Sequence, residues 1–356
     1  LQPTSDAGLF GRTEECIRLE SFLADGGRGR ILFFEGEPGI GKSRLLAELR
    51  RRAEARGVLV LTGRSWEVEM VRPFGVWTDL LDGLPPEKVP DDLRGELAPL
   101  MPSLGEPLPG NGSREQLFRA VEKLARCLLQ EGRPVLFVFD DIHWIDPASA
   151  ELLGHLSSRM EDLSPGWACA GRPGEFADNE PARALVRGWN RRGRLERLGV
   201  APLADRDAAA LARATSKSAD VQRIVATCGG NPLYLIESSR DGSGVASGQV
   251  RSLVADRLAA IDEPTCDIAR WAAVLGHAFP AARLADLLSQ PLDDVLRRTE
   301  ALERHGILRP HGEDWDFAHD LLRRATLAEL SGPRRVLMHR RIARVMRTEP
   351  DPDGSL

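Results

Sequence analysis

The chain has 356 residues, of which 42% are hydrophobic and 28% charged, a composition typical of a globular protein with two or three domains. Its formal net charge of -5 gives no electrostatic footprint for nucleic acid over the whole chain. The five cysteines contain no C-x-x-C pair, which argues against a disulfide framework or a zinc site and favours a reducing, cytoplasmic environment.

No apolar run approaches the ~20 residues that span a bilayer, so we expect no contact with the membrane. No secretory signal is visible at the N-terminus. The chain lacks an initial Met and closes on a polar tail. We therefore expect it to be a piece of a longer protein.

The first elements in the chain alternate as an α/β unit does. Ile31–Glu35 is a short apolar run typical of a buried strand, and Gly36–Gly41 follows as a loop. Apolar residues at helical spacing predict a helix over Ser43–Arg56, and Val58–Thr62 is a second strand candidate.

The same alternation continues after a Pro/Gly-rich insertion at Leu84–Gly112. Helical periodicity returns at Arg114–Gln130 and again at Ala148–Met160, with a predicted strand at Pro134–Phe139 between them. Trp167–Ala170 is a weaker fourth strand candidate. The pattern predicts an α/β fold of the P-loop kind, with a parallel sheet and helices on both faces.

Strand signals fade beyond Pro202. Leu203–Ser239 predicts short helices, and Gln249–Arg347 is mainly helical. Ile307–Phe317 interrupts the helices with two predicted short strands around a turn, an order of elements that suggests a winged helix. We therefore predict a P-loop nucleotide-binding domain at 1–200, a helical domain at 201–247, a winged-helix domain at 248–347 and a polar tail at 348–356.

Residues Gly36 to Ser43 read G-x-x-x-x-G-K-S, a loop whose backbone N–H groups can surround phosphate oxygens. The helix that follows adds the positive end of its dipole. Lys42 is expected to reach the β- and γ-phosphates, and the Ser43 hydroxyl to coordinate Mg²⁺. The other residues assigned to nucleotide binding here are Pro38, Gly39, Ile40, Gly41 and Arg44.

A buried strand candidate ends on two carboxylates, Asp140 and Asp141. Asp140 is expected to hold the Mg²⁺ ion. Asp141 is the candidate for polarising the attacking water, because a general base must stand slightly further out. The alternative for Asp141 is a cap of the next turn.

Three motifs together resemble a known family. They are D-D-I-H-W from Asp140, F-G-R-T-E from Phe10 and G-G-N-P-L-Y-L from Gly229. With the phosphate loop, they make the chain similar to the STAND branch of AAA+ ATPases, and especially to the large ATP-binding regulators of the LuxR family. The resemblance covers about Leu9 to Met346. It implies a transcriptional regulator whose DNA-binding domain lies outside this chain and whose effector is unknown.

The resemblance also implies roles for single residues around the base. Gly11 and Arg12 match the N-terminal segment that packs near the adenine. Pro232, after Asn231, matches the G-x-P proline that lies against the base. An ordinary turn with a solvated arginine and a simple helix start are the alternatives for these two motifs.

Two further residues match family positions near the phosphates. Arg172 matches the sensor arginine near the γ-phosphate, with a surface charge as its alternative. His319, in Ala318-His319-Asp320, matches the histidine that contacts the β-phosphate of ADP and holds the closed, inactive form. A structural histidine at a helix start is its alternative. His143 and Trp144 are interpreted as packing residues beneath the carboxylate strand.

These residues favour a switch that binds ATP or ADP with Mg²⁺, self-associates in the ATP state and is at most a slow ATPase. An AAA+ motor or origin-binding ATPase, and a P-loop transferase, are the alternatives. The arginines between Arg334 and Arg347 are interleaved with apolar residues, so we interpret them as the solvated face of an amphipathic helix.

Overall fold

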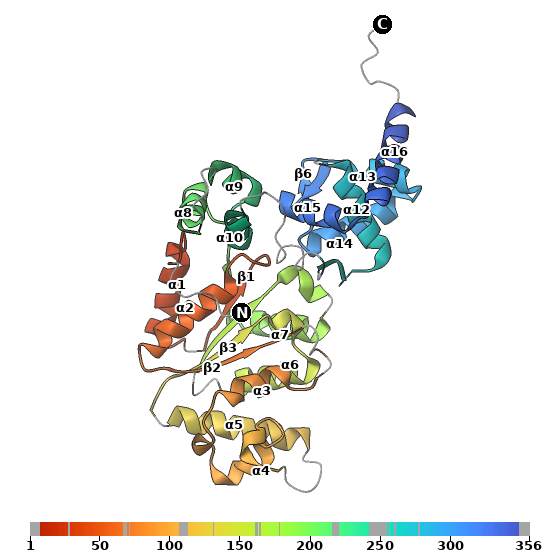
Figure 1. Cartoon of the computed structure of the whole chain (residues 1–356). Coiled ribbons are helices and arrows are strands. Elements are labelled where there is room, and N and C mark those ends of the chain that lie inside the picture. The colour runs from red at the N-terminus through yellow and green to blue at the C-terminus, as the bar shows by residue number, and fades with distance from the viewer. Residues whose placement is uncertain are drawn as a thin grey trace. The chain divides into compact units, whose positions relative to one another are not determined.

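The computed structural model describes residues 8–27, 29–66, 70, 72–106, 113–130, 132–160, 163, 165–177, 179–215, 221–241, 255, 257–259, 261–276 and 278–348. They form two compact units (Figure 1). One is Arg12–Ala201. The other comprises the described residues of Leu1–Gly11 and Pro202–Leu356.

The first unit is built on a five-stranded parallel sheet in the order β2-β3-β4-β1-β5 (Figure 1). The strands are β1 Ile31–Glu35, β2 Leu59–Arg64, β3 Val135–Asp140, β4 Gly166–Gly171 and β5 Leu195–Gly199. The predicted P-loop α/β fold is therefore confirmed. Because all strands run the same way, their carboxyl ends meet at one edge of the sheet, where such folds bind ligands.

Four of the five strands were predicted, and β5 was not. Its sequence, Leu-Glu-Arg-Leu-Gly, carries two charged residues and gives no continuous apolar run. These charges are satisfied by pairing: Glu196 accepts from Arg18 and Arg30, and Arg197 pairs with Glu35 on β1. An edge strand can carry such charged side chains because one of its sides is not covered by another strand.

Helices cover both faces of this sheet (Figure 1). α2, Lys42–Glu54, packs on one face through four buried apolar residues, with α1, Thr13–Ala24, beside it. The other face carries α3 Gly75–Asp82, α6 Pro147–Arg159 and α7 Glu180–Arg191, with α5 Arg114–Gln130 packed against α6.

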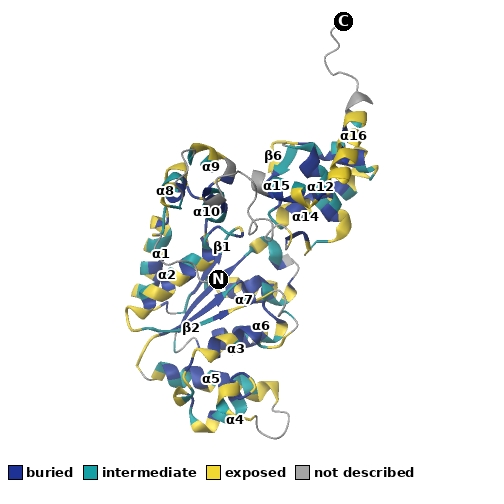
Figure 2. Cartoon of the chain, viewed as in Figure 1, coloured by how far each residue is buried: buried dark blue, intermediate teal, exposed yellow. Residues whose placement is uncertain are grey.

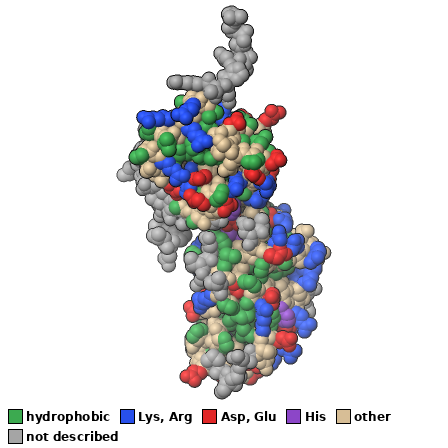
Figure 3. All heavy atoms as spheres, turned by 90° about the vertical axis from the view of Figure 1, so that its right-hand side faces the viewer, with side chains coloured by type: hydrophobic (Ala, Val, Ile, Leu, Met, Phe, Trp, Pro, Cys, Tyr) green, Lys and Arg blue, Asp and Glu red, His purple; other side chains and the backbone are tan. Residues whose placement is uncertain are grey.

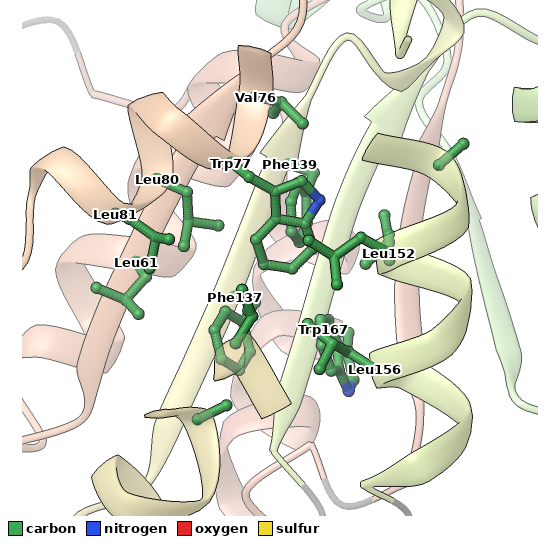
Figure 4. Close-up of a cluster of buried hydrophobic side chains, with 14 of the residues drawn as sticks. Leu61, Val76, Trp77, Leu80, Leu81, Phe137, Phe139, Leu152, Leu156 and Trp167 are labelled. Carbon is green, nitrogen blue, oxygen red and sulfur yellow. The ribbon is translucent and has the colours of Figure 1, made fainter. Parts of the chain in front are cut away.

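Aromatic side chains fill the core on this second face. Figure 4 shows Trp77 of α3 meeting Phe139 of β3, and their ring centroids are 5.2 Å apart. Phe137 stacks on Trp167 of β4 at 4.6 Å, and Leu152 of α6 closes the cluster. The central strands β1, β3 and β4 are dark blue in Figure 2 because nearly all of their side chains are buried. Burial of this kind, at about 25 cal/mol per Å² of apolar surface, is the main force that holds the sheet and helices together.

The described residues of the insertion at 84–112 include several short helices. It contains η2 Pro86–Lys88, η3 Asp91–Leu93, α4 Arg94–Leu97 and η4 Pro102–Leu104. Leu93, Leu97 and Met101 are buried in the same core as α5. Proline begins two of these short helices, where its missing N–H is not needed, so the Pro-rich composition is compatible with helix.

The second unit is helical with one hairpin. Its elements are α8 Asp205–Thr215, α9 Val221–Cys228, α10 Pro232–Asp241, α12 Glu263–Leu275, α13 Ala281–Leu288, α14 Leu292–Arg304, β6 Leu308–His311, β7 Asp314–Phe317, α15 Asp320–Glu329 and α16 Gly332–Thr348. The predicted antiparallel hairpin is confirmed, and Phe279 adds a bridge to Trp315 at its edge.

The last helix buries little of its surface. Met338 and Ile342 of α16 are buried against α12 and α13, whereas Leu337 is 67% exposed, and most of the helix is yellow in Figure 2. Basic and acidic side chains are interspersed over the face shown in Figure 3. Within the described parts of the chain, no helix combines the length and the apolar character needed to cross a membrane.

Candidate nucleotide-binding site

The loop between β1 and α2 is shaped by its glycines. A Cβ on Gly36 would lie 2.8 Å from the carbonyl oxygen of Val200, so only glycine lets the loop pass the end of β5. Gly41 has a φ of 109° at the start of α2, a conformation that side chains disfavour. The glycines thus fix a tight loop that leads directly into a helix N-terminus.

The start of α2 is suited to an anion. The helix begins without a side-chain cap, and the first N–H groups of a helix lack acceptors within it. Lys42 is only 5% exposed, and its Nζ donates to the carbonyl oxygens of Gly36 and Glu37 at 2.8 and 2.9 Å. The pKa of Lys42 is lowered to about 8. Burial makes the largest contribution, and the positive charge of Arg172 makes the second. A phosphate would supply the negative charge that this buried ammonium needs.

Asp140 and Ser43 meet at the carboxyl edge of the sheet. The carboxylate of Asp140, at the end of β3, accepts from the Ser43 hydroxyl and, at 2.9 Å, from the backbone N–H of Asp141. Burial and the neighbouring Asp141 raise the pKa of Asp140. A hydroxyl and a carboxylate side by side are oxygen ligands of the kind that Mg²⁺ accepts, so Ser43 and Asp140 would hold that ion.

Asp141 lies in a sharp turn and is held by an arginine. Its backbone φ is 54°, the left-handed region, and its side chain is 6% exposed. Arg64, the last residue of β2, donates to Asp141 Oδ2 from Nη2 at 2.8 Å and from Nε at 3.2 Å. The Arg64 guanidinium also stacks on Trp66, 4.3 Å from the ring centroid. The candidate general base is therefore ion-paired in this structure.

Arg172 follows β4 at the same edge of the sheet. Its Nη1 donates to Glu175 Oε1 at 2.8 Å, and its guanidinium lies 4.8 Å from the ring centroid of Trp144. Its positive charge contributes to the lowered pKa of Lys42. The structure thus brings Arg172 together with the phosphate loop and the two carboxylates.

His143 lies beneath these groups. It is 1% exposed, and its pKa is lowered to about 2. Burial is the main cause, and the positive charge of Arg172 is the second. Its Nε2 is 3.2 Å from Glu175 Oε2 and 3.9 Å from Asp141 Oδ1. The imidazole is neutral at ordinary pH, so neither contact is an ion pair.

Arg12 is placed against the phosphate loop. It is 6% exposed, and it donates to the carbonyl oxygens of Ile40 at 2.9 Å and Ala201 at 2.7 Å. It also pairs with Glu15 at 2.9 Å. Arg12 therefore joins the start of α1, the loop and the end of β5. Gly11 belongs to the other unit, where a Cβ would collide with Asp207 of α8.

The second unit brings Pro232 and His319 close together. Pro232 is the first residue of α10, after the fully buried Asn231. His319 immediately precedes α15, and its ring makes an edge contact with Tyr234, 4.8 Å between centroids. A Cβ on Gly229 would lie 2.9 Å from His319 Nδ1. His319 thus packs against the turn that begins the Asn231-Pro232 motif.

Arg64 and Glu175 are the site residues that the sequence did not reveal. Arg64 stands opposite Asp140 in the register of β2 and β3, so its place depends on which strands are neighbours. The sequence carried one signal for Arg64. Arg64 follows the predicted strand Val58–Thr62, so it had to lie near the same carboxyl edge of the sheet as Asp140. Glu175 lies in η6, Pro173–Ala177, three residues after Arg172.

The comparison with protein families gives the site its context. The family model described as AAA ATPase domain matches residues 8–166, a range that includes the phosphate loop and both carboxylates. The chain contains an AAA ATPase domain. This fold implies nucleotide binding, usually with Mg²⁺, and its members often oligomerise.

Individual relatives are distant. The Walker-type ATPase PABY2304 of Pyrococcus abyssi is 17% identical to this chain, with a TM-score of 0.57. The match covers 92% of this chain and 98% of the PABY2304 chain. The STAND protein PH0952 of Pyrococcus horikoshii, which has a tetratricopeptide repeat sensor, is 17% identical with a TM-score of 0.39 over 98% of this chain. Uncharacterized protein R02095 of Rhizobium meliloti (strain 1021) is 28% identical over 160 residues, 36% of this chain. This chain covers 47% of PH0952 and 15% of R02095.

Proposed function

We propose that this chain is the ATP- and ADP-binding switch of a STAND-type signalling protein, of the kind found in LuxR-family transcriptional regulators. In this proposal Mg²⁺ accompanies the nucleotide, and DNA is read by a domain outside this chain. ADP holds a closed form, and ATP permits an open form that self-associates in the cytoplasm.

The phosphate site supports nucleotide binding. The uncapped start of α2 and the buried Lys42 favour the phosphates, and Ser43 with Asp140 favours the metal ion. In the proposal Arg172 contacts the γ-phosphate, because it lies at the same edge of the sheet and close to Lys42.

One observation favours a switch over a motor. The candidate general base Asp141 is buried, and its Oδ2 is paired with Arg64 at 2.8 Å, so one of its two carboxylate oxygens is not free to accept a proton from water. General-base catalysis needs a carboxylate within hydrogen-bond reach of the attacking water. We therefore expect hydrolysis to be slow.

The second unit supplies the proposed sensor of the closed state. In the proposal Pro232 lies against the base, and His319 donates to the β-phosphate of ADP. The packing of His319 on the Gly229 turn supports a shared role for these two motifs. Helices α12 to α14, the β6–β7 hairpin and the Phe279–Trp315 bridge have the order of elements in a winged helix, which is how we interpret them.

The nucleotide that copurifies with the chain tests this proposal. Purified protein is denatured, and the released nucleotide is identified by chromatography. Steady-state ATP hydrolysis with Mg²⁺ is then measured. Bound ADP with turnover far below the ~10 s⁻¹ median of enzymes is the expected result. A nucleotide-free protein that also fails to bind added ATP or ADP would overturn the proposal, and turnover near the median would favour a motor.

A further inference from the structure

Arg172 is held from two sides by residues that have not been assigned a part in nucleotide binding. Trp144, in η5 (Ile142–Trp144), offers its ring face to the guanidinium at 4.8 Å. Glu175, in η6, accepts a 2.8 Å hydrogen bond from Nη1. These contacts come from the turn after β3 and the turn after β4, so they fix Arg172 relative to the carboxyl ends of both strands.

The guanidinium of Arg172 has N–H donors that make no hydrogen bond to the described residues. Arg172 is 16% exposed, and its Nε is buried without a hydrogen-bond partner among the described residues. Among the described residues, the Arg172 side chain makes one hydrogen bond, from Nη1 to Glu175. A guanidinium with five N–H donors can therefore satisfy Glu175 along one edge and a phosphate oxygen along another.

We infer that Trp144 and Glu175 are positioning residues that aim Arg172 at the γ-phosphate and thereby raise the affinity for ATP relative to that for ADP. The inference rests on the proposed function. A flexible arginine loses side-chain conformational entropy whenever it binds a phosphate. An arginine already stacked and hydrogen-bonded has lost most of that freedom before ATP arrives, so its contact with the γ-phosphate is stronger.

Geometry and charge make separable predictions at Glu175. Glu175→Gln keeps an acceptor oxygen at the same reach but removes the negative charge. Glu175→Asp keeps the charge but shortens the side chain by one methylene. If Glu175 positions Arg172 through the hydrogen bond, Gln preserves the ATP preference and Asp loses it. A purely electrostatic role predicts the opposite order.

The substitutions at Trp144 change no charge at all. Trp144→Phe keeps an aromatic face for the guanidinium, whereas Trp144→Leu removes it. A cation–π contact of this kind alters affinity by roughly two- to thirtyfold. We expect Leu to lower ATP affinity within that range and Phe to restore most of it, with ADP affinity changed less than about twofold in both.

The experiment measures Kd for ATP and for ADP by calorimetry with Mg²⁺, and the readout is the ratio of the two. A merely structural role would weaken both nucleotides together and leave the ratio unchanged. Trp189→Phe and Glu180→Ala are the matched controls, since Trp189 is buried elsewhere in the same unit and Glu180 pairs with exposed arginines of α7. Melting temperatures confirm that each variant is folded.

Arg172→Ala separates this inference from the function itself. We expect it to reduce the ATP-to-ADP preference at least as much as Trp144→Leu. If Arg172→Ala changes the ratio but the Trp144 and Glu175 variants do not, the positioning role is wrong and the switch proposal stands. An unchanged ratio in Arg172→Ala overturns the inference as well. A wild-type chain that binds neither nucleotide overturns the proposed function.

Discussion

At the scale of single residues, the site is defined by charges that are paired before any ligand binds. Arg64 pairs with Asp141 and Glu175 pairs with Arg172, whereas the hydrogen bonds of the buried Lys42 go to the backbone carbonyls of Gly36 and Glu37. Pairing a cation with a carboxylate offsets the loss of hydration that burial imposes on both. The same pairing lowers reactivity, because a paired carboxylate oxygen is less free to accept a hydrogen bond from the attacking water.

Releasing Asp141 from its arginine should accelerate hydrolysis. We expect Arg64→Met, which keeps most of the side-chain volume, to raise kcat roughly tenfold, a part of the 10²–10⁴-fold that general-base catalysis supplies. ATP affinity should stay within about twofold. Steady-state kinetics with Mg²⁺ measures both quantities.

Two variants make this test specific. Arg94→Met is the control, because Arg94 is similarly exposed and pairs with Asp91 outside the site. Combining Arg64→Met with Asp141→Asn should abolish the gain, since no base is then released. A gain that survives Asp141→Asn, or no gain at all, would show that Arg64 does not restrain catalysis.

The buried neutral His143 should make the fold sensitive to acid. Its folded pKa is lowered to about 2, while the unfolded chain binds a proton near the ordinary value of ~6.5. The unfolded state therefore binds more protons below pH 6.5, and stability falls as pH falls through this range. This single group should remove about 2 kcal/mol from the free energy of unfolding between pH 7 and pH 5.

Urea unfolding of wild type and His143→Asn at pH 7 and pH 5 checks this effect. Asparagine does not titrate, so the variant should lose about 2 kcal/mol less than wild type over the interval. Equal losses in the two proteins would mean that His143 is protonated in the folded state. The comparison cancels other titrating groups, since both proteins carry them.

At the scale of elements, Arg12 links three segments that are far apart in sequence. Its guanidinium satisfies carbonyls of the phosphate loop and of the chain just after β5, and both belong to the same unit as Arg12. Arg12→Met should destabilise this unit by about 2–4 kcal/mol, because buried carbonyls lose charge-assisted donors. Nucleotide affinity should fall too, since Ile40 is part of the loop.

Thermal unfolding and nucleotide titration measure the two effects. Arg50→Met is the matched control, as Arg50 lies on α2 and pairs with Glu54 in an exposed i,i+4 contact. We expect the control to change stability by less than about 0.5 kcal/mol. An Arg12→Met protein as stable as the control would show that these hydrogen bonds contribute little to the stability of the unit.

The sequence predicted most of this unit because its signals are local. The apolar runs of β1 and β3, the leucine stripe of α2 and the glycine spacing of the loop each need only a few neighbouring residues. β5 was missed since its charged residues are satisfied by distant partners. The pairing of Arg64 with Asp141 depends on β2 lying next to β3, a tertiary fact that no local pattern contains.

At the scale of the whole molecule, each unit has its own hydrophobic core and its own part of the proposed nucleotide contacts. The first holds the phosphate loop and the acidic strand end, and the second holds Pro232 and His319. A ligand that contacts two units in one state and a single unit in another shifts the balance between those states by its difference in affinity. This is the physical basis of the proposed switch.

His319→Ala tests that switch directly. In the proposal the imidazole donates one hydrogen bond to the β-phosphate of ADP in the closed form, and the open ATP form does not use it. Loss of a hydrogen bond to a charged group removes about 1.5–3 kcal/mol, which changes a two-state ratio by about 10- to 150-fold. ADP affinity should fall within that range, ATP affinity should change much less, and X-ray scattering should report a less compact ADP form.

His311→Ala is the control, because His311 is an exposed histidine on β6 in the same unit. His319 is also packed against Tyr234, so its loss can lower stability without any role in binding. The ratio of ADP to ATP affinity separates the two effects, since a general loss of packing weakens both nucleotides alike. Equal ADP affinity in His319→Ala and wild type, with unchanged scattering, would show that His319 is a structural histidine. Another residue would then have to stabilise the closed form.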